Sequence, residues 1–486
     1  MDQRCARQRG RLFLFAALVF LNCASYGVRL RAQTQTVPAI SDALFKSLQF
    51  RALGPAIVGG RIDDFAVVES NPHIIYVATA SGGLWKTINN GTTWEPLFDS
   101  QAHSSIGDVA VAPSNPDIVW VGTGEANNRQ SSSWGNGVYK STDGGKTWEH
   151  AGLRDSQHIG RIVIHPTNPD IVYVAAAGHL WGTNKERGLF KTTDGGKTWT
   201  NTKFINDDTG FIDVAMDPNE PETLYAAAYQ RRRTAFGFNG GGPGSGLYKT
   251  TDGAATWKKL TEGLPVGDAG RIGIDIWRKD TKVVYITYEH ATESGVYRSD
   301  DRGTTWQKQS NINPRPAYYS QIRIDPQNDQ RVYVLGAGWY VSDNGGKSFT
   351  NNRLLPIHGD YHALWINPAN PNHLLAGSDG GIHFSYDKGK TWDYINTLPL
   401  GQFYEVGFDM RNPYWVYGGL QDNGSWGAPS QTLTKKRGRN RSCAWIAQRA
   451  NCSGTRSSTK GDSIPKGTRS LLSPLAASPG TERASL

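Results

Sequence analysis

A short segment, Gly137–Trp148 with the sequence GVYKSTDGGKTW, recurs along the chain and limits its fold more than any other feature. Its first residues alternate as in a half-buried strand. Asp143 and Gly145 supply a turn, because Asp accepts hydrogen bonds from nearby N–H groups and Gly adopts positive φ without steric cost. Trp148 starts a second extended run and carries enough apolar surface to anchor a layer. Each copy therefore predicts a β-hairpin.

The copies define a repeat with a period of 43–58 residues. Most units also contain an earlier turn with Asn and Pro, such as Ser114-Asn115-Pro116, and a degenerate version lies near 278–281, so four strands are expected per unit. One unit cannot bury both faces of its sheet, and units must stack. The pattern predicts an all-β fold, a β-propeller of four-stranded blades with seven full blades and a partial eighth; a β-solenoid or a string of small β domains is the alternative. The hairpins end at Trp94, Trp148, Trp199, Trp257, Trp306, Phe349 and Trp392.

Four segments divide the chain. Residues 1–32 predict a signal peptide, because four arginines precede an apolar run too short for a membrane span, although Cys23 raises a lipoprotein alternative. Residues 33–49 are a polar lead-in, and residues 50–433 are the propeller, with an eighth strand pair near its end; an incomplete propeller is the alternative. Residues 434–486 predict a disordered basic tail, which we interpret as frameshifted or unrelated sequence; a natural tail that binds an anionic surface is the alternative.

The net charge of +9 belongs to the two ends of the chain. Residues 435–486 contain 11 basic residues (Lys and Arg) but 2 acidic residues (Asp and Glu). Residues 1–32 contain 6 basic residues and 1 acidic residue. The body between them is mildly acidic, which removes the support for a nucleic-acid partner. Its lack of cysteine means that no disulfide stabilises it. We expect an exported protein (periplasmic, secreted or at the cell surface) without a transmembrane span in the mature chain.

The hairpins resemble Asp-box (BNR) repeats, which occur in sialidases, xyloglucanases and the sortilin propeller domain. The pattern SxDxGxTW is complete at Ser141–Trp148, whereas Asn89 and Asn344 replace Asp in the first and sixth copies. The stretch from about 50 to 426 is similar to the sortilin-like propeller proteins of bacteria, often labelled glycosyl hydrolases. The resemblance implies a propeller in which the Asp box is a structural turn, and it leaves the chemistry open. Related proteins usually continue beyond this point, which favours the interpretation of a truncated chain.

Loops after the second and fourth strands of each unit vary in length, and function usually depends on such loops. Aromatic side chains there lie beside amides, arginines and carboxylates, a combination that suits a sugar or a peptide. The alternative is that the loops only pack against one another. The ligand-binding candidates in these loops are Glu125, Arg129, Trp134, Trp181 and Arg232.

Three Gly-Arg-Ile segments place Arg61, Arg161 and Arg271 in predicted inner strands. Sialidases hold a substrate carboxylate with three arginines, since guanidinium groups bind carboxylates bidentately. These three do not share one register relative to the following turn, so they need not converge. The alternative is pairing with carboxylates on the channel wall, namely Asp63, Asp64, Asp108 or Asp213.

A glycosidase needs two carboxylates that face one cleft. The catalytic candidates are Glu125, Asp64 and Asp422, and Glu186 and Glu289 are also available. The resembled xyloglucanases place their acids between two propellers, and this chain has at most one, which disfavours an enzyme.

His358, Asp360 and His362 lie on one side of an extended segment and are the metal candidates, although such a cluster also arises by chance among 11 His. No motif for a catalytic serine or a phosphate loop is present, and no cofactor is expected. We therefore expect a binding or assembly module for an extracellular or periplasmic peptide, protein or glycan. The alternatives are a xyloglucanase- or sialidase-like hydrolase fragment, or an incomplete ring without stable function unless Phe50–Leu53 closes it.

Overall fold

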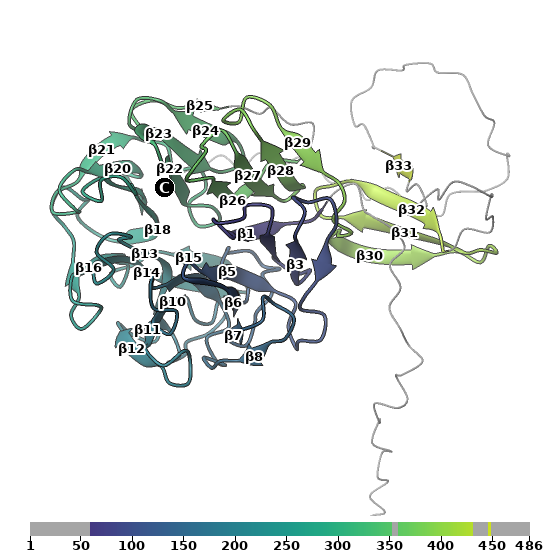
Figure 1. Ribbon diagram of the computed structural model, residues 1–486, viewed down its shortest axis with the longest axis horizontal. Helices are drawn as coiled ribbons and strands as arrows, with labels where there is room; N and C mark the ends of the chain where they lie inside the picture. The colour runs from purple at the N-terminus through teal and green to yellow at the C-terminus, as the bar shows by residue number, and fades with distance from the viewer. Residues whose placement is uncertain (1–58, 352–357, 431–445, 449–486) are drawn as a thin grey trace, which may run out of the picture. The chain divides into compact units, whose positions relative to one another are not determined.

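The computed structural model describes residues 59–351 and 358–430, and the backbone of 446–448. The predicted signal peptide and lead-in lie outside these ranges. Within them every regular element is a strand, and no helix is present that could span a membrane. The strands form eight antiparallel sheets that follow one another along the chain (Figure 1). The all-β prediction and the four-stranded repeat are confirmed, with one extra strand, β15, in the fourth sheet.

The first four sheets, blades 1 to 4, contain the following strands: β1 (Ile62–Val67), β2 (Ile75–Thr79), β3 (Leu84–Thr87), β4 (Glu95–Pro96); β5 (Ile106–Ala112), β6 (Asn115–Thr123), β7 (Val138–Ser141), β8 (Glu149–His150); β9 (Ile159–Ile164), β10 (Val172–Ala176), β11 (Gly188–Thr192), β12 (Thr200–Lys203); β13 (Thr209–Met216), β14 (Leu224–Thr234), β15 (Gly237–Gly240), β16 (Gly246–Thr250) and β17 (Lys258–Lys259).

Blades 5 to 7 and the eighth sheet contain these strands: β18 (Ala269–Ile276), β19 (Val284–His290), β20 (Gly295–Ser299), β21 (Gln307–Ser310); β22 (Gln321–Asp325), β23 (Asn328–Leu335), β24 (Trp339–Ser342), β25 (Thr350–Asn351); β26 (Tyr361–Ile366), β27 (Leu374–Ser378), β28 (Gly381–Ser385), β29 (Asp393–Ile395); β30 (Phe403–Phe408), β31 (Trp415–Leu420), β32 (Ser425–Pro429) and β33 (Ile446–Gln448).

Seven blades form a closed ring. The first strand of each blade contacts the first strand of the next, from β1 through β5, β9, β13, β18 and β22 to β26, and β26 contacts β1 (Figure 1). At the closure, Ile62 and Phe65 share one buried cluster with Ala363 and Leu375 of the seventh blade. The ring therefore closes without the Phe50–Leu53 strand, which lies outside the described residues, and the incomplete-ring hypothesis loses its premise.

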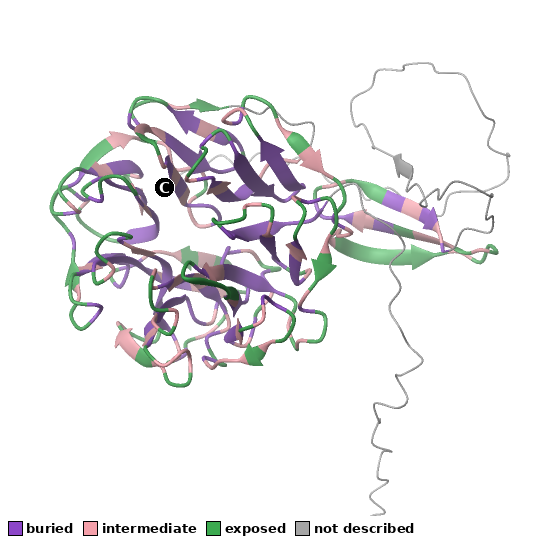
Figure 2. Ribbon diagram, viewed as in Figure 1, coloured by how far each residue is buried: buried purple, intermediate pink, exposed green. Residues whose placement is uncertain are grey.

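The eighth sheet differs from the seven blades in its burial. Every residue of β30 is exposed, as the green strand in Figure 2 shows, whereas β1 is buried throughout. The predicted strand pair near Phe403–Tyr417 is confirmed, and β32 and β33 extend it. The strand β33 lies inside 434–486, the segment interpreted as a disordered tail, and the rest of that segment lies outside the described residues. At 446–448 the backbone pairs with the edge of β32, which offers unpaired backbone groups to a nearby extended segment.

The antiparallel order of each blade divides the turns between two faces. The Asn-Pro turns join the first and second strands, and the Asp boxes join the third and fourth. Because both connections lie at the same end of antiparallel strands, they share one face of the ring, here called the turn face. Connections from the second strand to the third lie on the opposite face, here called the loop face.

The Asp box is a structural turn, as the family resemblance implied. Asp143 Oδ1 accepts hydrogen bonds from the Thr147 N–H at 2.9 Å and the Ser141 hydroxyl at 2.8 Å, and its Oδ2 accepts from the Thr147 hydroxyl at 2.7 Å. The Ser141 hydroxyl oxygen accepts in turn from the Gly145 N–H at 2.8 Å. These bonds from Thr147 and Ser141 lower the pKa of Asp143 to about 2. Both oxygens of the Asp143 carboxylate thus accept hydrogen bonds from residues of its own hairpin.

Replacing Asp143 by alanine is expected to lower the melting temperature by a few degrees at pH 7, whereas Asp143→Asn should change it little. Asn89 already fills this position in the first box, where its Oδ1 accepts from the Thr93 N–H at 2.9 Å. Because the folded pKa of Asp143 is depressed, its contribution is present above the unfolded pKa of roughly 3.9 and is lost as pH falls toward 2. Thermal melts at pH 7 and pH 3 test this, and an Asn variant as unstable as the Ala variant at pH 7 would contradict it.

Candidate functional site

A cluster of charged side chains lies on the loop face, where residues preceding β1, the loop after β6 and the turn between β27 and β28 meet. The Arg61 guanidinium donates from Nη1 to Glu125 Oε1 at 2.8 Å and from Nε to Asp379 Oδ1 at 2.8 Å. All three side chains are at most 3% exposed. Together with Arg129 and Asp422 nearer the surface, they are here called the loop-face cluster.

The loop that carries Glu125 depends on the glycine before it. Gly124 has φ of +88°, and a Cβ at this position would lie 1.8 Å from the carbonyl oxygen of Gln157. Only glycine can therefore begin this loop. The Glu125 N–H then donates to the Ser105 hydroxyl at 3.0 Å, and buried Arg231 donates to the Ala126 carbonyl at 3.0 Å. These contacts fix the loop and direct the Glu125 carboxylate toward Arg61.

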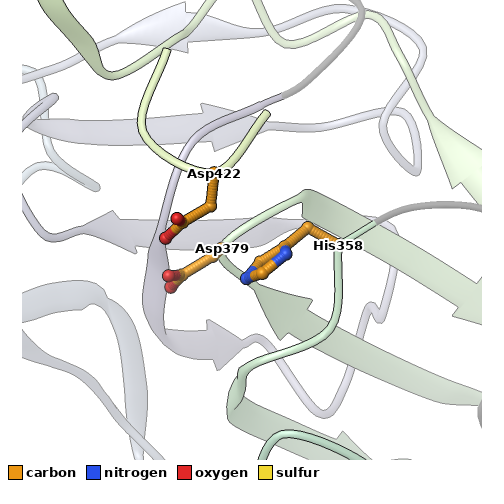
Figure 3. Close-up of side chains that lie close together, drawn as sticks. All are labelled: His358, Asp379 and Asp422. Atoms are coloured by element: carbon orange, nitrogen blue, oxygen red, sulfur yellow. The ribbon is translucent and has the colours of Figure 1, made fainter. Parts of the chain in front are cut away.

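Asp422 brings a second carboxylate to Asp379 at the surface. Arg129 Nη1 lies 4.0 Å from Asp379 Oδ2 and 3.9 Å from Asp422 Oδ2. Asp422 is 41% exposed, in contrast to 3% for Asp379. Figure 3 shows both carboxylates beside His358, and one ligand atom from each residue lies within 4.8 Å of the others. These three groups could hold a cation, although Arg129 already places a positive charge beside both carboxylates.

The environment sets opposite protonation preferences within the cluster. Burial raises the pKa of Asp379, but hydrogen bonds from His362 and Arg61 outweigh this and hold its pKa well below the usual range. Burial raises the pKa of Glu125, and the charge of Arg61 opposes this only in part. Asp63 lies close by, and burial raises its pKa well above the usual range. Its Oδ2 accepts no hydrogen bond from any described residue.

Two acids at this site have unusual backbone angles. Asp360 has φ of +56° and Asp422 has φ of +57°, in the left-handed region that favours glycine. Backbone strain of this kind persists only where the surroundings hold it, and it is frequent at functional sites. Asp422 lies in the tight turn between β31 and β32, where Asp adopts this conformation more readily than most residues.

The metal candidates predicted from the sequence do not converge on a single point. His358 Nε2 lies 3.4 Å from Asp360 Oδ2, while His362 Nε2 lies 2.9 Å from Asp379 Oδ1. His362 is thus paired with an acid that the sequence analysis did not select. The Ser-Asp-Gly-Gly segment around Asp379 resembles an ordinary turn, and no local signal distinguishes it.

The three Gly-Arg-Ile arginines occupy separate environments. Arg161 lies 2.9 Å from Asp108, 3.3 Å from Asp213 and 3.5 Å from Asp64, as the alternative of pairing on the channel wall predicted. Arg271 Nη1 donates to Asn127 Oδ1 at 3.1 Å. The structure therefore does not bring the three guanidinium groups to one substrate carboxylate, and it separates Asp64 from the other catalytic candidates.

The remaining candidates are dispersed over the loop face. Trp134 and Trp181 are 60% and 51% exposed, so both are available to a ligand. Arg232 pairs with Asp208. Glu186 accepts the Asp155 N–H, and Glu289 accepts the Arg271 N–H at 2.7 Å, so these two acids support loops.

The fold and the site define an Asp-box β-propeller with a charged, partly exposed cluster on its loop face. The model of the Sortilin-Vps10 family, described as sortilin, neurotensin receptor 3, matches residues 136–294. A xyloglucanase of Acetivibrio thermocellus is 25% identical over 370 residues, which cover 65% of this chain and 41% of that protein. An oligoxyloglucan-reducing end-specific xyloglucanase of Emericella nidulans is 26% identical over 248 residues, covering 41% of this chain and 30% of that protein.

Solved structures agree on the fold. The GH74 enzyme of Niastella koreensis superimposes with a TM-score of 0.55 at 19% identity, over 77% of this chain and 60% of that one. The GH74 xyloglucanase of Xanthomonas campestris superimposes with a TM-score of 0.57 at 16% identity, over 82% of this chain and 67% of that one. The chain spans less than half the length of the curated relatives it matches.

Proposed function

We propose that this protein is an exported propeller that binds and hydrolyses a polysaccharide at the loop-face cluster. The observation that carries the proposal is the pair formed by Asp379 and Asp422, whose nearest oxygens lie within 4.8 Å. Retaining glycosidases hold their two carboxyl groups about 5–5.5 Å apart. The xyloglucanases among its relatives support a β-glucan such as xyloglucan as the first substrate to test.

The two acids are suited to different roles. Asp379 is buried and its pKa is held well below the usual range, by hydrogen bonds that outweigh the effect of burial, so its negative charge can stabilise the oxocarbenium-like transition state. Asp422 is 41% exposed and can donate a proton to the glycosidic oxygen as the bond to the sugar C1 breaks. Water then supplies hydroxide to C1 and returns a proton to Asp422.

A binding module remains the second candidate, and one observation favours it. Arg61 donates to both Glu125 and Asp379, so protein groups already satisfy the two buried carboxylates. In such a site only Arg129, Asp422 and exposed tryptophans such as Trp134 would contact the ligand. The ligand would then be a glycan or a peptide that is held without turnover.

Asp422→Asn is expected to reduce the release of reducing ends from xyloglucan by at least ~100-fold, because general acid catalysis contributes about 10²–10⁴-fold. Binding measured by calorimetry should persist in this variant. Asp393→Asn, the same change in the exposed outer strand β29, is the matched control and should keep wild-type activity. Equal activity of Asp422→Asn and wild type would exclude the proposed acid, while binding without turnover in the wild type would establish the binding module.

A further inference from the structure

The turn face contains a cavity that the proposed function does not use. It has a volume of about 550 Å³ and is lined by residues from the first strands of all seven blades. Exposed Glu69, Pro113 and Pro218, at the ends of these strands, mark its opening at the turn face. The volume lies within the usual range for small-ligand sites, roughly 300–1,000 Å³. This space is here called the axial cavity.

Side-chain size along the strands explains why the axial cavity exists. Residues two apart in a strand face the same side, and equivalent positions on blades 1, 2 and 4 hold Ala66, Ala110 and Ala215. The blades on the other side place larger groups in the cavity wall, among them Asp275 and Trp365. The small side chains leave one side of the axis open, and the wall combines apolar side chains with charged ones.

The inner end of the axial cavity is charged. Arg161 lies there within 3.5 Å of Asp64, Asp108 and Asp213. Asp108 is 1% exposed. Its Oδ2 accepts a hydrogen bond from the Ile162 N–H at 2.7 Å, whereas its Oδ1 accepts no hydrogen bond from any described residue and lies 2.9 Å from Arg161. Burial raises the pKa of Asp108 well above the usual range, which indicates that Arg161 alone does not compensate this carboxylate.

Negative charge exceeds positive charge around the axial cavity. Its lining contains five carboxylates but three arginines. Glu69 and Arg278 neutralise each other at the opening, at 2.8 Å. Midway along the wall, Asp275 is partly exposed. Burial raises its pKa despite the positive charge of Arg323, which also lines the cavity, and the hydrogen bond from the Ile324 N–H. A cationic group that entered the axial cavity would therefore meet carboxylates at two depths, in a lining where carboxylates outnumber arginines by two.

We propose that the axial cavity binds a primary ammonium group carried on a flexible alkyl chain. The apolar part of the wall, which includes Ala66, Ala110 and Ala215, would contact the methylene groups. Asp275 would meet the ammonium head in front of the Asp108 and Asp213 carboxylates. A lysine side chain of an extracellular peptide and a free alkyl diamine share this chemistry. The site lies on the face opposite the loop-face cluster and does not rest on the proposed hydrolytic function.

Calorimetry on the full chain tests the site with three probes: a lysine-containing peptide, the same peptide with acetylated lysine, and 1,5-diaminopentane. The peptide, the diamine or both should bind, and acetylation should abolish binding. Binding of the diamine alone would identify a free amine as the ligand, and binding of the peptide alone would identify a peptide partner. Absence of binding by both amines at millimolar concentration, or equal binding of the acetylated peptide, would overturn the proposal.

Two variants localise the binding. Asp275→Asn keeps an oxygen for the Ile324 N–H and should weaken amine affinity at least tenfold, while Asp393→Asn, far from the axial cavity in β29, should leave it unchanged. Ala110→Leu fills the cavity wall and should also block binding, with circular dichroism and the melting curve confirming that the variant is folded. Amine affinity that survives both Asp275→Asn and Ala110→Leu would show that the ligand lies elsewhere.

Discussion

Replacing Arg61 by methionine is expected to lower the free energy of unfolding at pH 7 by about 3–5 kcal/mol, because removing one partner of a buried ion pair leaves uncompensated charge. Arg61 is the shared partner of Glu125 and Asp379, at 2.8 Å from each. All three side chains are at most 3% exposed, so water cannot replace the lost guanidinium. Urea denaturation followed by circular dichroism measures the change.

The loss of unfolding free energy in Arg61→Met should depend on pH. Without Arg61, the folded-state pKa of Glu125, which burial already raises, rises further above that in the unfolded chain, and Asp379 loses one of the two partners that lower its pKa. Carboxylates with raised pKa values penalise the folded state at high pH, and the penalty is relieved as pH falls and they take up protons. The difference between wild type and Arg61→Met should therefore shrink between pH 7 and pH 5.

A matched control is the exposed pair of Arg278 and Glu69, which also lie 2.8 Å apart but are 52% and 49% exposed. Exposed ion pairs contribute about 0–1 kcal/mol, so Arg278→Met should have a small effect. If Arg61→Met lowered the free energy of unfolding no more than this control, the charge of Arg61 would not stabilise the fold through Glu125 and Asp379.

The sequence predicts the fold of this protein well because each blade repeats its own local chemistry. The Asp143 turn, the Asn-Pro turn and Trp148 are all set by residues close in sequence, so seven copies specify seven hairpins and their spacing. The closure of the ring at blade 7 does not depend on residues that are close in sequence. It depends on Ile62 and Leu375 packing together across 313 positions of the chain, and no periodicity reveals which blade meets the first.

The candidate site is predictable only in part. Glu125, Arg129 and Asp422 were found because unusual polar residues stand out in variable loops, and the structure brings them into one cluster with Arg61. Asp379 was missed because an Asp before two glycines is also the ordinary chemistry of a turn. Its role appears only in the fold, where Arg61, 318 residues away in the sequence, approaches it. Local sequence patterns do not show contacts between residues so far apart in the chain, even where each residue is unusual by itself.

Arg161→Met is expected to be at least as destabilising at pH 7 as Arg61→Met, about 3–5 kcal/mol, because it leaves three neighbouring carboxylates without their shared cation. Asp108, Asp213 and Asp64 all lie within 3.5 Å of this guanidinium. They come from blades 2, 4 and 1, so the repulsion would act across the ring and separate blades that Arg161 now holds together. The measurement is again urea denaturation at pH 7.

A double-mutant cycle with Asp108→Asn separates charge from packing. The single Asp108→Asn change should cost less than ~1 kcal/mol, because burial already disfavours the charged form of Asp108 and neutral replacement of a buried charge is often tolerated. In the Arg161→Met background the same change removes one of three repelling carboxylates and should restore about 1–3 kcal/mol, as expected for residues in direct contact. Simple additivity of the two changes would mean that Arg161 stabilises the ring through its methylene groups rather than its charge.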